Sequence, residues 1–263
     1  MKKIVFTFDD GREDNYSVVF PLMSHYNLTG TIFVTTGFVD GTWEKPESWK
    51  SAEKPLSIDQ IIDLKKNGWE IGLHGDRHTT ELKDTLLSIE KMNHWLGEEN
   101  TYGFSMPNSV AVENELQSFI QGCSGKICYM RRGRKRNTKK LSSKILYGLY
   151  RFLGSNEAYQ KFNSVNWMQQ SKINKNEVYS VVIRSEDNPY MIIKFIDQIP
   201  DNTIVVFMLH SVLDKTHPLF NADPWCWSKE NFKIFCEELS KRIEKNELKV
   251  ENLKNALEEE NHD

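Results

Sequence analysis

The sequence predicts an α/β fold, a distorted barrel of parallel strands that is covered by helices. Short apolar runs alternate with segments of helical periodicity along the chain, which is typical of a parallel sheet packed against helices. Roughly seven such strand–helix units are present, more than a small open sheet accommodates, and this favours a barrel. The chain has 263 residues, 39% hydrophobic and 27% charged, so it holds enough apolar material for one large core.

The predicted strands are short apolar and β-branched runs. They cover residues 4–8, 29–35, 69–73, 126–130, 178–183 and 204–209. The predicted helices cover residues 15–26, 57–67, 81–96, 113–121 and 228–245. The helix at 57–67 has clear end signals, because Ser57 is a good N-cap and Gly68 stops the helix. Residues 36–55 lack periodicity, so we expect a long loop there, over the functional site.

Two further segments fall outside this pattern. Residues 131–177 form an insert that the barrel does not require, and residues 247–263 are polar and acidic. We therefore expect one barrel domain over residues 1–246, which includes the insert, and a polar C-terminal tail over residues 247–263.

The bulk properties exclude several classes of protein. A net charge of −3 and a pI near 6.2 leave no global basic field that would attract nucleic acid. The four cysteines match no zinc-finger spacing, so we expect reduced thiols. Asp9 and Asp10 interrupt the first apolar run too early for a signal peptide, and no run approaches the roughly 20 residues of a membrane span. These features predict a soluble cytoplasmic protein.

Ionisable residues stand directly after three of the predicted strands. Asp9 and Asp10 follow the run 4–8, His74 follows the run 69–73, and His210 follows the run 204–209. Because the carboxyl ends of parallel strands meet at one edge of a sheet, we expect these side chains to lie close together. His78 lies one helical turn beyond His74 and joins the same group.

This set of side chains indicates metal-assisted hydrolysis. Two neutral imidazoles and one carboxylate bind zinc or a similar ion and leave positions open for water and substrate. Consecutive residues point in different directions, so we assign Asp10 to the ion with His74 and His78, and Asp9 as the general base. A histidine on the opposite side, His210, would protonate a departing amine. Zinc fits best, and cobalt, nickel, manganese and iron also accept this ligand set.

Three segments resemble motifs of a known family. Residues 7–11 (Thr-Phe-Asp-Asp-Gly), 74–78 (His-Gly-Asp-Arg-His) and 206–210 (Val-Phe-Met-Leu-His) are similar to the first, second and fifth motifs of the polysaccharide deacetylases, carbohydrate esterase family 4 or the NodB homology domain. The resemblance spans about residues 3–240. It implies a distorted (β/α)7 barrel, removal of N-acetyl groups from amino sugars, and the same roles for the five residues named above.

The third motif departs from the family pattern. The family usually has Phe-Arg-x-Pro-Tyr-Gly, whereas residues 104–109 read Phe-Ser-Met-Pro-Asn-Ser. The retained proline suggests that the loop path survives, and the backbone N–H of Asn108 would help to bind the oxyanion. Ser105 replaces the arginine that normally holds the catalytic aspartate. Arg131, Arg132 and Arg184 are the candidates to take its place.

The fourth motif, usually Asp-x-x-Asp-Trp, is not recognisable. Residues 185–188 (Ser-Glu-Asp-Asn) stand at about the corresponding place, and Asp187 is the candidate to orient His210.

The insert begins with a basic run and continues into an amphipathic helix. Seven of the ten residues 131–140 are Lys or Arg, and apolar residues form a helical stripe over 141–153. One interpretation is a solvated loop that leads into a helix packed on the barrel. The other is that the cations meet the phosphate of a nucleotide-sugar, a lipid-linked sugar or an anionic membrane surface. No recognition motif favours nucleic acid.

Three functional hypotheses follow. The first is a metal-dependent hydrolase that removes an N-acyl group, an N-acetyl group above all, from an amino sugar, as a step in making a precursor of surface polysaccharide or glycolipid. The second keeps the reaction and changes the substrate to another small amide or a formylated sugar. The third is an inactive barrel that binds carbohydrate.

Overall fold

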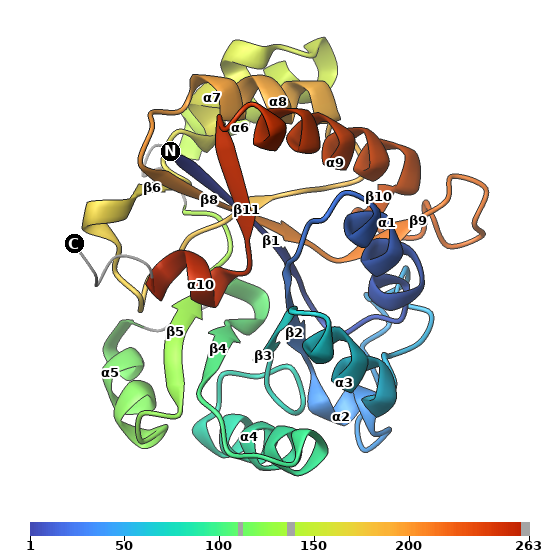
Figure 1. Cartoon of the computed structure of the whole chain (residues 1–263), viewed down its shortest axis with the longest axis vertical. Helices are drawn as coiled ribbons and strands as arrows, with labels where there is room; N and C mark the ends of the chain where they lie inside the picture. Colours follow the sequence, from blue (N-terminus) through green and yellow to red (C-terminus); the bar gives the residue numbers. More distant parts are fainter. Residues whose placement is uncertain (110–112, 136–139, 259–263) are drawn as a thin grey trace.

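The computed structural model describes residues 1–109, 113–135 and 140–258. It shows a curled sheet of mostly parallel strands with helices on its outer face (Figure 1). The predicted barrel-like α/β architecture is therefore confirmed.

The main sheet has the strand order β5-β4-β3-β2-β1-β8-β6. Its strands are β1 (Lys2–Phe8), β2 (Thr31–Val34), β3 (Glu70–Leu73), β4 (Tyr102–Ser105), β5 (Ile127–Arg131), β6 (Trp167–Gln169) and β8 (Thr203–Leu209). All neighbours are parallel except β6, which runs antiparallel to β8. The parallel arrangement brings the ends of β1, β3 and β8 to one edge.

Two short strands complete the curl. β7 (Val181–Val182) pairs with the second half of β8, and Val178 just before it forms a bridge with Arg131 of β5. The segment 178–182 therefore joins the two sides of the sheet. On the other side, β11 (Leu248–Glu251) pairs with the first half of β1, while β2 pairs with its second half.

Aromatic packing fixes β1 against the helix layer. The ring of Phe6 lies 5.8 Å from that of Phe232 and 5.4 Å from that of Phe235, both in helix α9 (Lys229–Glu244). All three side chains are fully buried. Each buried phenyl ring contributes about 1.5–3 kcal/mol through removal from water, so this cluster holds in place the strand that ends at Asp9.

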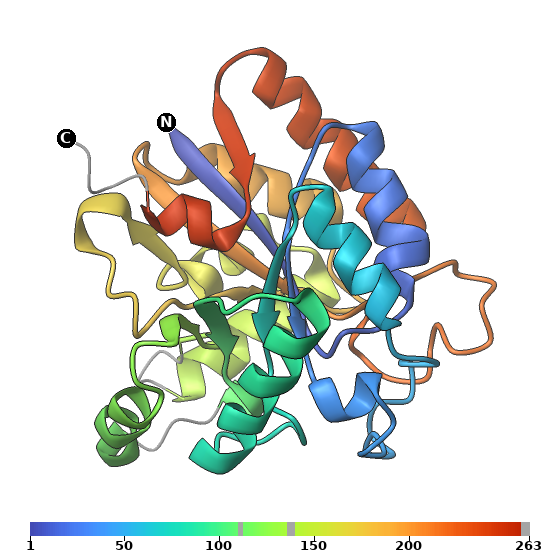
Figure 2. The ribbon, with the colours of Figure 1, turned by 60° about the horizontal axis from the view of Figure 1, so that its bottom comes forward.

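The helices surround the sheet. They are η1 (Asn15–Val19), α1 (Phe20–His25), α2 (Thr36–Val39), α3 (Ile58–Lys66), α4 (Leu82–Leu96), α5 (Glu113–Gly122), α6 (Lys140–Leu153), α7 (Asn156–Asn163), α8 (Pro189–Gln198), α9 and α10 (Leu253–Glu258). Figures 1 and 2 show α9 beside α1, and α3 beside α4, outside the sheet. Helix α3 begins as expected, because Ser57 accepts a hydrogen bond from the Gln60 N–H in a capping box. None of the helices in the described part of the chain is long and apolar enough to cross a membrane.

The insert contains α6, α7 and β6. Helix α7 packs against both α6 and α8, at the top of Figure 1. Residues 136–139 of the basic run lie outside the described residues. The four cysteines are free thiols, as expected.

The C-terminal segment differs from the expected polar tail. Residues 248–251 form β11 within the main sheet, and Leu253, Ala256 and Leu257 of α10 are buried. The segment is short, and its few apolar residues stand among Glu, Lys and Asn. Its amphipathic pattern is therefore weak in the sequence. Residues 259–263 lie outside the described residues.

Candidate active site

The carboxyl ends of β1, β3 and β8 meet at a cavity of about 240 Å³. Its lining comprises Asp9, Asp10, Arg12, Ser48, Trp49, His74, His78, Met106, Asn108, Met208, His210 and Trp225. The structure therefore brings together all five residues that the sequence analysis assigned to metal binding and acid–base chemistry.

Three of these side chains form a candidate metal-binding cluster. Oδ1 of Asp10 lies 3.5 Å from Nε2 of His74 and 3.9 Å from Nε2 of His78, and the two Nε2 atoms are 3.1 Å apart. A tetrahedral zinc ion with bonds of about 2.0–2.1 Å separates its ligand atoms by about 3.3 Å. The three donor atoms thus stand at the spacing that one divalent ion requires.

Neighbouring groups select which atom each ligand offers. Nδ1 of His74 lies 2.8 Å from the carbonyl oxygen of Ser105, so we assign the ring proton to Nδ1, where it is donated to that oxygen, and the lone pair to Nε2. Arg12 donates from Nε and Nη2 to Oδ2 of Asp10, at 2.9 and 2.7 Å. Its Nη1 donates to the hydroxyls of Ser51 and Ser211. Oδ1 of Asp10 is therefore the oxygen that faces the histidines.

The loop that carries the histidines is not helical, although their spacing equals one helical turn. Asp84 of α4 accepts hydrogen bonds from the N–H groups of Asp76 and Arg77, both at 2.9 Å, and fixes the loop. Asp10 and His78 have left-handed backbones, with φ of 79° and 55°. Such conformations cost roughly 1–3 kcal/mol outside glycine and concentrate at functional sites.

Asp9 is supported by an arginine from a different strand than in the family pattern. Its Oδ1 accepts hydrogen bonds from Nη2 of Arg131 and, at 3.4 Å, from the hydroxyl of Ser105. Burial alone would raise the pKa of Asp9, but Arg131, His74 and His210 lower it to about 2, so the carboxylate is ionised at neutral pH. Of the three candidate arginines, Arg131 is the one that reaches Asp9.

The other two candidates have different contacts. Arg132 forms an ion pair with Glu177 at 3.5 Å. The guanidinium of Arg184 lies over the ring of Trp225, 4.9 Å from its centroid.

The imidazoles of His78 and His210 are neutral in the free protein. Burial and the neighbouring His74 lower the pKa of His78 to about 3. Burial, Arg12 and Arg131 lower the pKa of His210 to about 4, against the opposing effect of Asp10 and Asp9. Neutral imidazole is the form that binds a metal ion.

His210 lacks the support that the sequence analysis proposed. Its Nδ1 is buried and has no hydrogen-bond partner among the described residues, and its ring lies 4.8 Å from that of Trp225. Asp187 instead accepts a hydrogen bond from the N–H of Arg184 at 2.8 Å and closes a local turn. The expected pairing of Asp187 with His210 is therefore not formed, because the turn at 184–187 holds the carboxylate.

Asn108 lies at the rim of the cavity with an exposed side chain and a left-handed backbone, φ 55°. The sequence analysis missed Arg12, Met106 and Met208, which carry no distinctive motif of their own. For Trp49 and Trp225 a signal existed, because tryptophan in loop-like segments often lines a binding site.

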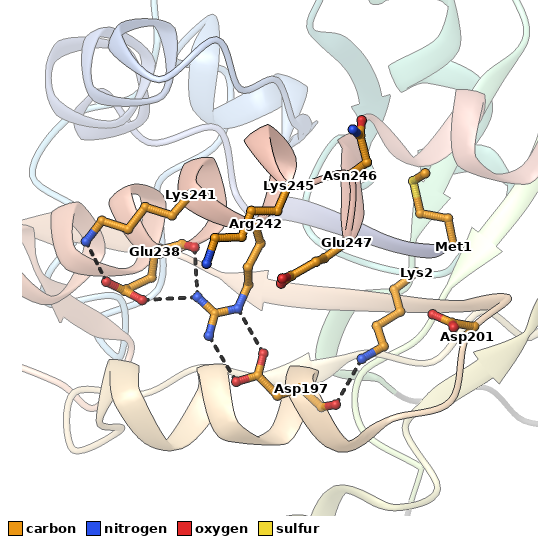
Figure 3. Close-up of a pocket in the computed structure, with 10 residues that line it drawn as sticks. All are labelled: Met1, Lys2, Asp197, Asp201, Glu238, Lys241, Arg242, Lys245, Asn246 and Glu247. Carbon is orange, nitrogen blue, oxygen red and sulfur yellow. Dashed lines mark hydrogen bonds and ion pairs between the residues drawn. The ribbon is translucent and has the colours of Figure 1, made fainter.

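A larger hollow of about 810 Å³ lies at the opposite end of the barrel, where β1, β8 and β11 begin. Figure 3 shows that its charged side chains bind one another: Arg242 contacts both Asp197 and Glu238, and Lys241 contacts Glu238. Because several of its charges are paired with one another and none of the five candidate site residues lines it, we place the candidate active site at the smaller cavity.

Comparison with known proteins agrees with this geometry. Residues 1–117 match the polysaccharide deacetylase family. No curated protein matches the chain. Among solved structures, a peptidoglycan N-acetylglucosamine deacetylase has a TM-score of 0.53 at 10% identity, over 97% of this chain and 87% of that chain.

Two further structures are similar at lower scores. A family 4 acetyl xylan esterase from Clostridium thermocellum, solved with a cobalt ion, has a TM-score of 0.49 at 13% identity, over 97% of this chain and 89% of that chain. The Streptococcus pyogenes deacetylase PplD, solved with acetate, has a TM-score of 0.41 at 19% identity, over 50% of this chain and 56% of that chain. The match thus spans little more than half the length of PplD. Residues 1–117 thus resemble the polysaccharide deacetylase family, and the chain as a whole shares the fold of the peptidoglycan N-acetylglucosamine deacetylase.

Proposed function

We propose that the protein is a metal-dependent hydrolase that removes an N-acyl group, an N-acetyl group above all, from an amino sugar. The observation that carries this proposal is the pairing of two adjacent carboxylates with different partners. Asp10 faces the two histidines, whereas Asp9 is held by Arg131 and lines the same cavity. One acid is thus arranged as a ligand and the other as a base.

Asp10 Oδ1, His74 Nε2 and His78 Nε2 would hold the metal ion. When bound, a divalent cation supplies Lewis-acid polarisation of the acyl carbonyl and makes water a better nucleophile. Zinc suits the mixed nitrogen and oxygen donors, and cobalt, nickel, manganese and iron are the alternatives.

Asp9 accepts the proton of the attacking water, since its carboxylate is ionised and lies beside the cluster. The water oxygen bonds to the acyl carbon and the carbon–nitrogen bond breaks, which yields a carboxylate and a free amine. The backbone N–H of Asn108 assists the oxyanion at the rim.

His210 protonates the departing amine. Its imidazole is neutral in the free protein, so the proton that Asp9 takes from the attacking water has to pass to His210 before the amine leaves. The unpartnered Nδ1 leaves the ring without a fixed tautomer, which distinguishes this site from one with a supporting carboxylate.

The expected substrate is a cytoplasmic precursor of surface polysaccharide or glycolipid. The same residues would also cleave another small amide or a formylated sugar, because the reacting group is an amide carbonyl in every case. The basic insert adds a proposed contact with an anionic membrane surface, for which the exposed apolar residues of α6 provide the support.

The test is an assay of amine release with the purified protein. The protein is stripped with a chelator and reloaded with zinc, cobalt, nickel or manganese, and then given chitooligosaccharides, nucleotide-linked acetamido sugars and small amides. We expect metal-dependent amine release from an acetamido sugar. The Asp9→Asn variant should keep one bound ion and lose turnover. Metal-loaded protein that binds sugar but releases no amine from any substrate would instead support the inactive barrel.

A further inference from the structure

A second cavity, of about 430 Å³, adjoins the candidate active site. The two cavities share Asn108, Met208 and Trp225 in their linings. The ring of Trp225 lies 4.8 Å from that of His210, and the guanidinium of Arg184 lies over it, 4.9 Å from its centroid. A substrate whose acyl group sits beside His210 therefore has a continuous path into the second cavity, whose volume is typical of small-molecule sites.

The lining of this second cavity is cationic. Arg134, Lys144 and Arg184 line it, and no acidic side chain does among the residues that the structure describes there. The chain as a whole has 37 acidic and 34 basic residues. The described lining of this cavity, with three basic residues and no acidic one, is therefore more cationic than the sequence average. A local positive potential in a recessed site attracts anions.

Aromatic rings hold two of the cations in place. The guanidinium of Arg134 lies over Phe162, 3.6 Å from the ring centroid, and that of Arg184 lies over Trp225. Arginine binds phosphate and carboxylate through the planar N–H edge of its guanidinium, and a stacked ring fixes the orientation of that edge. Tyr147 and Tyr150 add flat faces of the kind that pack against sugar rings.

Acids on the neighbouring segment do not cancel this charge. Glu186 accepts a hydrogen bond from the Tyr147 hydroxyl and pairs with Arg151 at 3.6 Å. Asp187 is buried and bonded to the Arg184 N–H, and burial raises its pKa to about 7. Neither Glu186 nor Asp187 is among the described residues that line the cavity.

Half of the lining comes from the insert. Arg134, Lys144, Tyr147, Tyr150 and Phe162 lie within residues 131–177, on α6, on α7 and in the segment before them. The curled sheet closes through residues 178–182, and the insert adds the short antiparallel strand β6 to it besides the helices α6 and α7. The insert therefore lines one side of the cavity next to the candidate active site. Side chains at this position contact the part of the substrate beyond the acyl group and so would determine which substrates bind.

We propose that this cavity is a subsite that binds an anionic group of the amino-sugar substrate, either a phosphate ester or a carboxylate. The inference rests on the proposed function, since it names the class of sugar that the same site would hydrolyse. An oxyanion held by Arg134, Lys144 and Arg184 would fix the sugar while its acyl group lies beside Asp9 and His210.

The test compares anionic and neutral sugars in the zinc-loaded Asp9→Asn variant by titration calorimetry. The probes are N-acetylglucosamine 1-phosphate, N-acetylmuramic acid and neutral N-acetylglucosamine. We expect at least one anionic probe to bind about tenfold or more tightly than the neutral sugar. The better of the two anionic probes identifies phosphate or carboxylate as the group.

Substitutions in the wall locate the effect. Adding Arg134→Gln or Lys144→Gln should each reduce the anion preference by about tenfold, and Arg134→Lys should keep most of it because it keeps the charge. The matched control is Lys161→Gln, an exposed residue of α7 that pairs with Glu157 and lines neither cavity. Lys144 is exposed, so its variant tests the proposal even if the Arg134 variants fail to fold.

Equal affinity for anionic and neutral sugars, or an anion preference that survives both glutamine substitutions, would overturn the subsite. Amine release by the wild-type protein separates this outcome from failure of the hydrolase proposal. Turnover without anion preference refutes the subsite alone. Arg134-dependent anion binding without turnover of any sugar supports the subsite and refutes the hydrolase.

Discussion

Arg131, at the end of β5, donates a hydrogen bond to Oδ1 of Asp9, at the end of β1. The hydroxyl of Ser105, at the end of β4, accepts a second hydrogen bond from the same guanidinium nitrogen. The arginine that the family usually has in the third motif is Ser105 in this chain, and Arg131 of the next strand contacts Asp9 instead. Serine is smaller than arginine and leaves room for the side chain of Arg131 to extend to Asp9. The carboxylate that we propose as the base is thus supported from β5.

Replacing Arg131 by Met should lower kcat by roughly a hundredfold, because Asp9 loses its orienting partner. Arg131 helps to lower the pKa of Asp9, so without it the carboxylate should protonate at higher pH and the acidic limb of the pH–rate profile should move upward. Arg132→Gln, which breaks the pair with Glu177 and the contact with the Tyr179 ring, is the control and should leave the profile in place. An unchanged acidic limb in the Arg131 variant would show that Arg131 has no role in positioning Asp9.

Removing Arg12 should weaken metal binding. Arg12 engages Oδ2 of Asp10 through two nitrogen atoms, so Arg12→Gln would free the carboxylate to rotate away from the histidines. Supporting contacts of this kind are worth about 10–100-fold in metal affinity. Zinc affinity measured by competition with a chromophoric chelator checks the change, and Ser51→Ala, which removes only one other partner of Arg12, should have a smaller effect.

Asp187 should make stability fall as the pH rises. Burial raises the pKa of Asp187 from 3.8 to about 7, so between these values the folded protein holds a proton that the unfolded chain has lost. The free energy of unfolding then decreases with increasing pH, by up to about 1.4 kcal/mol per pH unit, and levels off above about pH 7.

Asp187→Asn removes this titration and keeps an acceptor for the Arg184 N–H. Urea unfolding at several pH values should therefore give a flatter profile for this variant than for the wild type between pH 4 and 7. The exposed Asp201→Asn variant is the control. Parallel profiles for wild type and Asp187→Asn would contradict the raised pKa.

The exposed apolar residues of α6 should bind anionic membranes. Phe152 and Leu153 are 79% and 74% exposed, and Lys144 and Arg151 lie on the same helix. This combination of apolar and basic side chains is typical of helices that lie in a membrane interface. We expect sedimentation with vesicles that contain phosphatidylglycerol and little with pure phosphatidylcholine.

The double variant Phe152→Ser and Leu153→Ser should abolish that sedimentation. Tyr190→Ser on α8 changes an exposed apolar residue elsewhere, 57% exposed, and should leave it intact. Equal sedimentation of all three proteins would rule out α6 as the contact.

Four of the five candidate site residues were predictable because each stands directly after a strand that is visible in the local sequence, whereas His78 was found from its spacing to His74. The β-branched runs of β1 and β8 place Asp9, Asp10 and His210 without knowledge of the rest of the fold. The choice of Arg131 among three arginines was not predictable, because it depends on how β5 curls toward β1 in space.

Strand β4 escaped prediction for a related reason. It is only four residues long and contains Gly103, which weakens the strand signal. In the structure that glycine makes room for a distant side chain, since a Cβ at this position would lie 2.0 Å from the ring of Tyr129. The requirement comes from packing between β4 and β5, which local periodicity does not contain.

The pairing of β1 has a consequence for how the protein is made. Lys3 lies opposite Ile204 of β8 and Lys249 of β11, so both neighbours of its first half are synthesised long after it. During translation β1 is an apolar strand without its β8 and β11 partners. Unpaired apolar strands of this kind favour aggregation. The pairing of β1 is therefore complete only when residues near position 250 have left the ribosome.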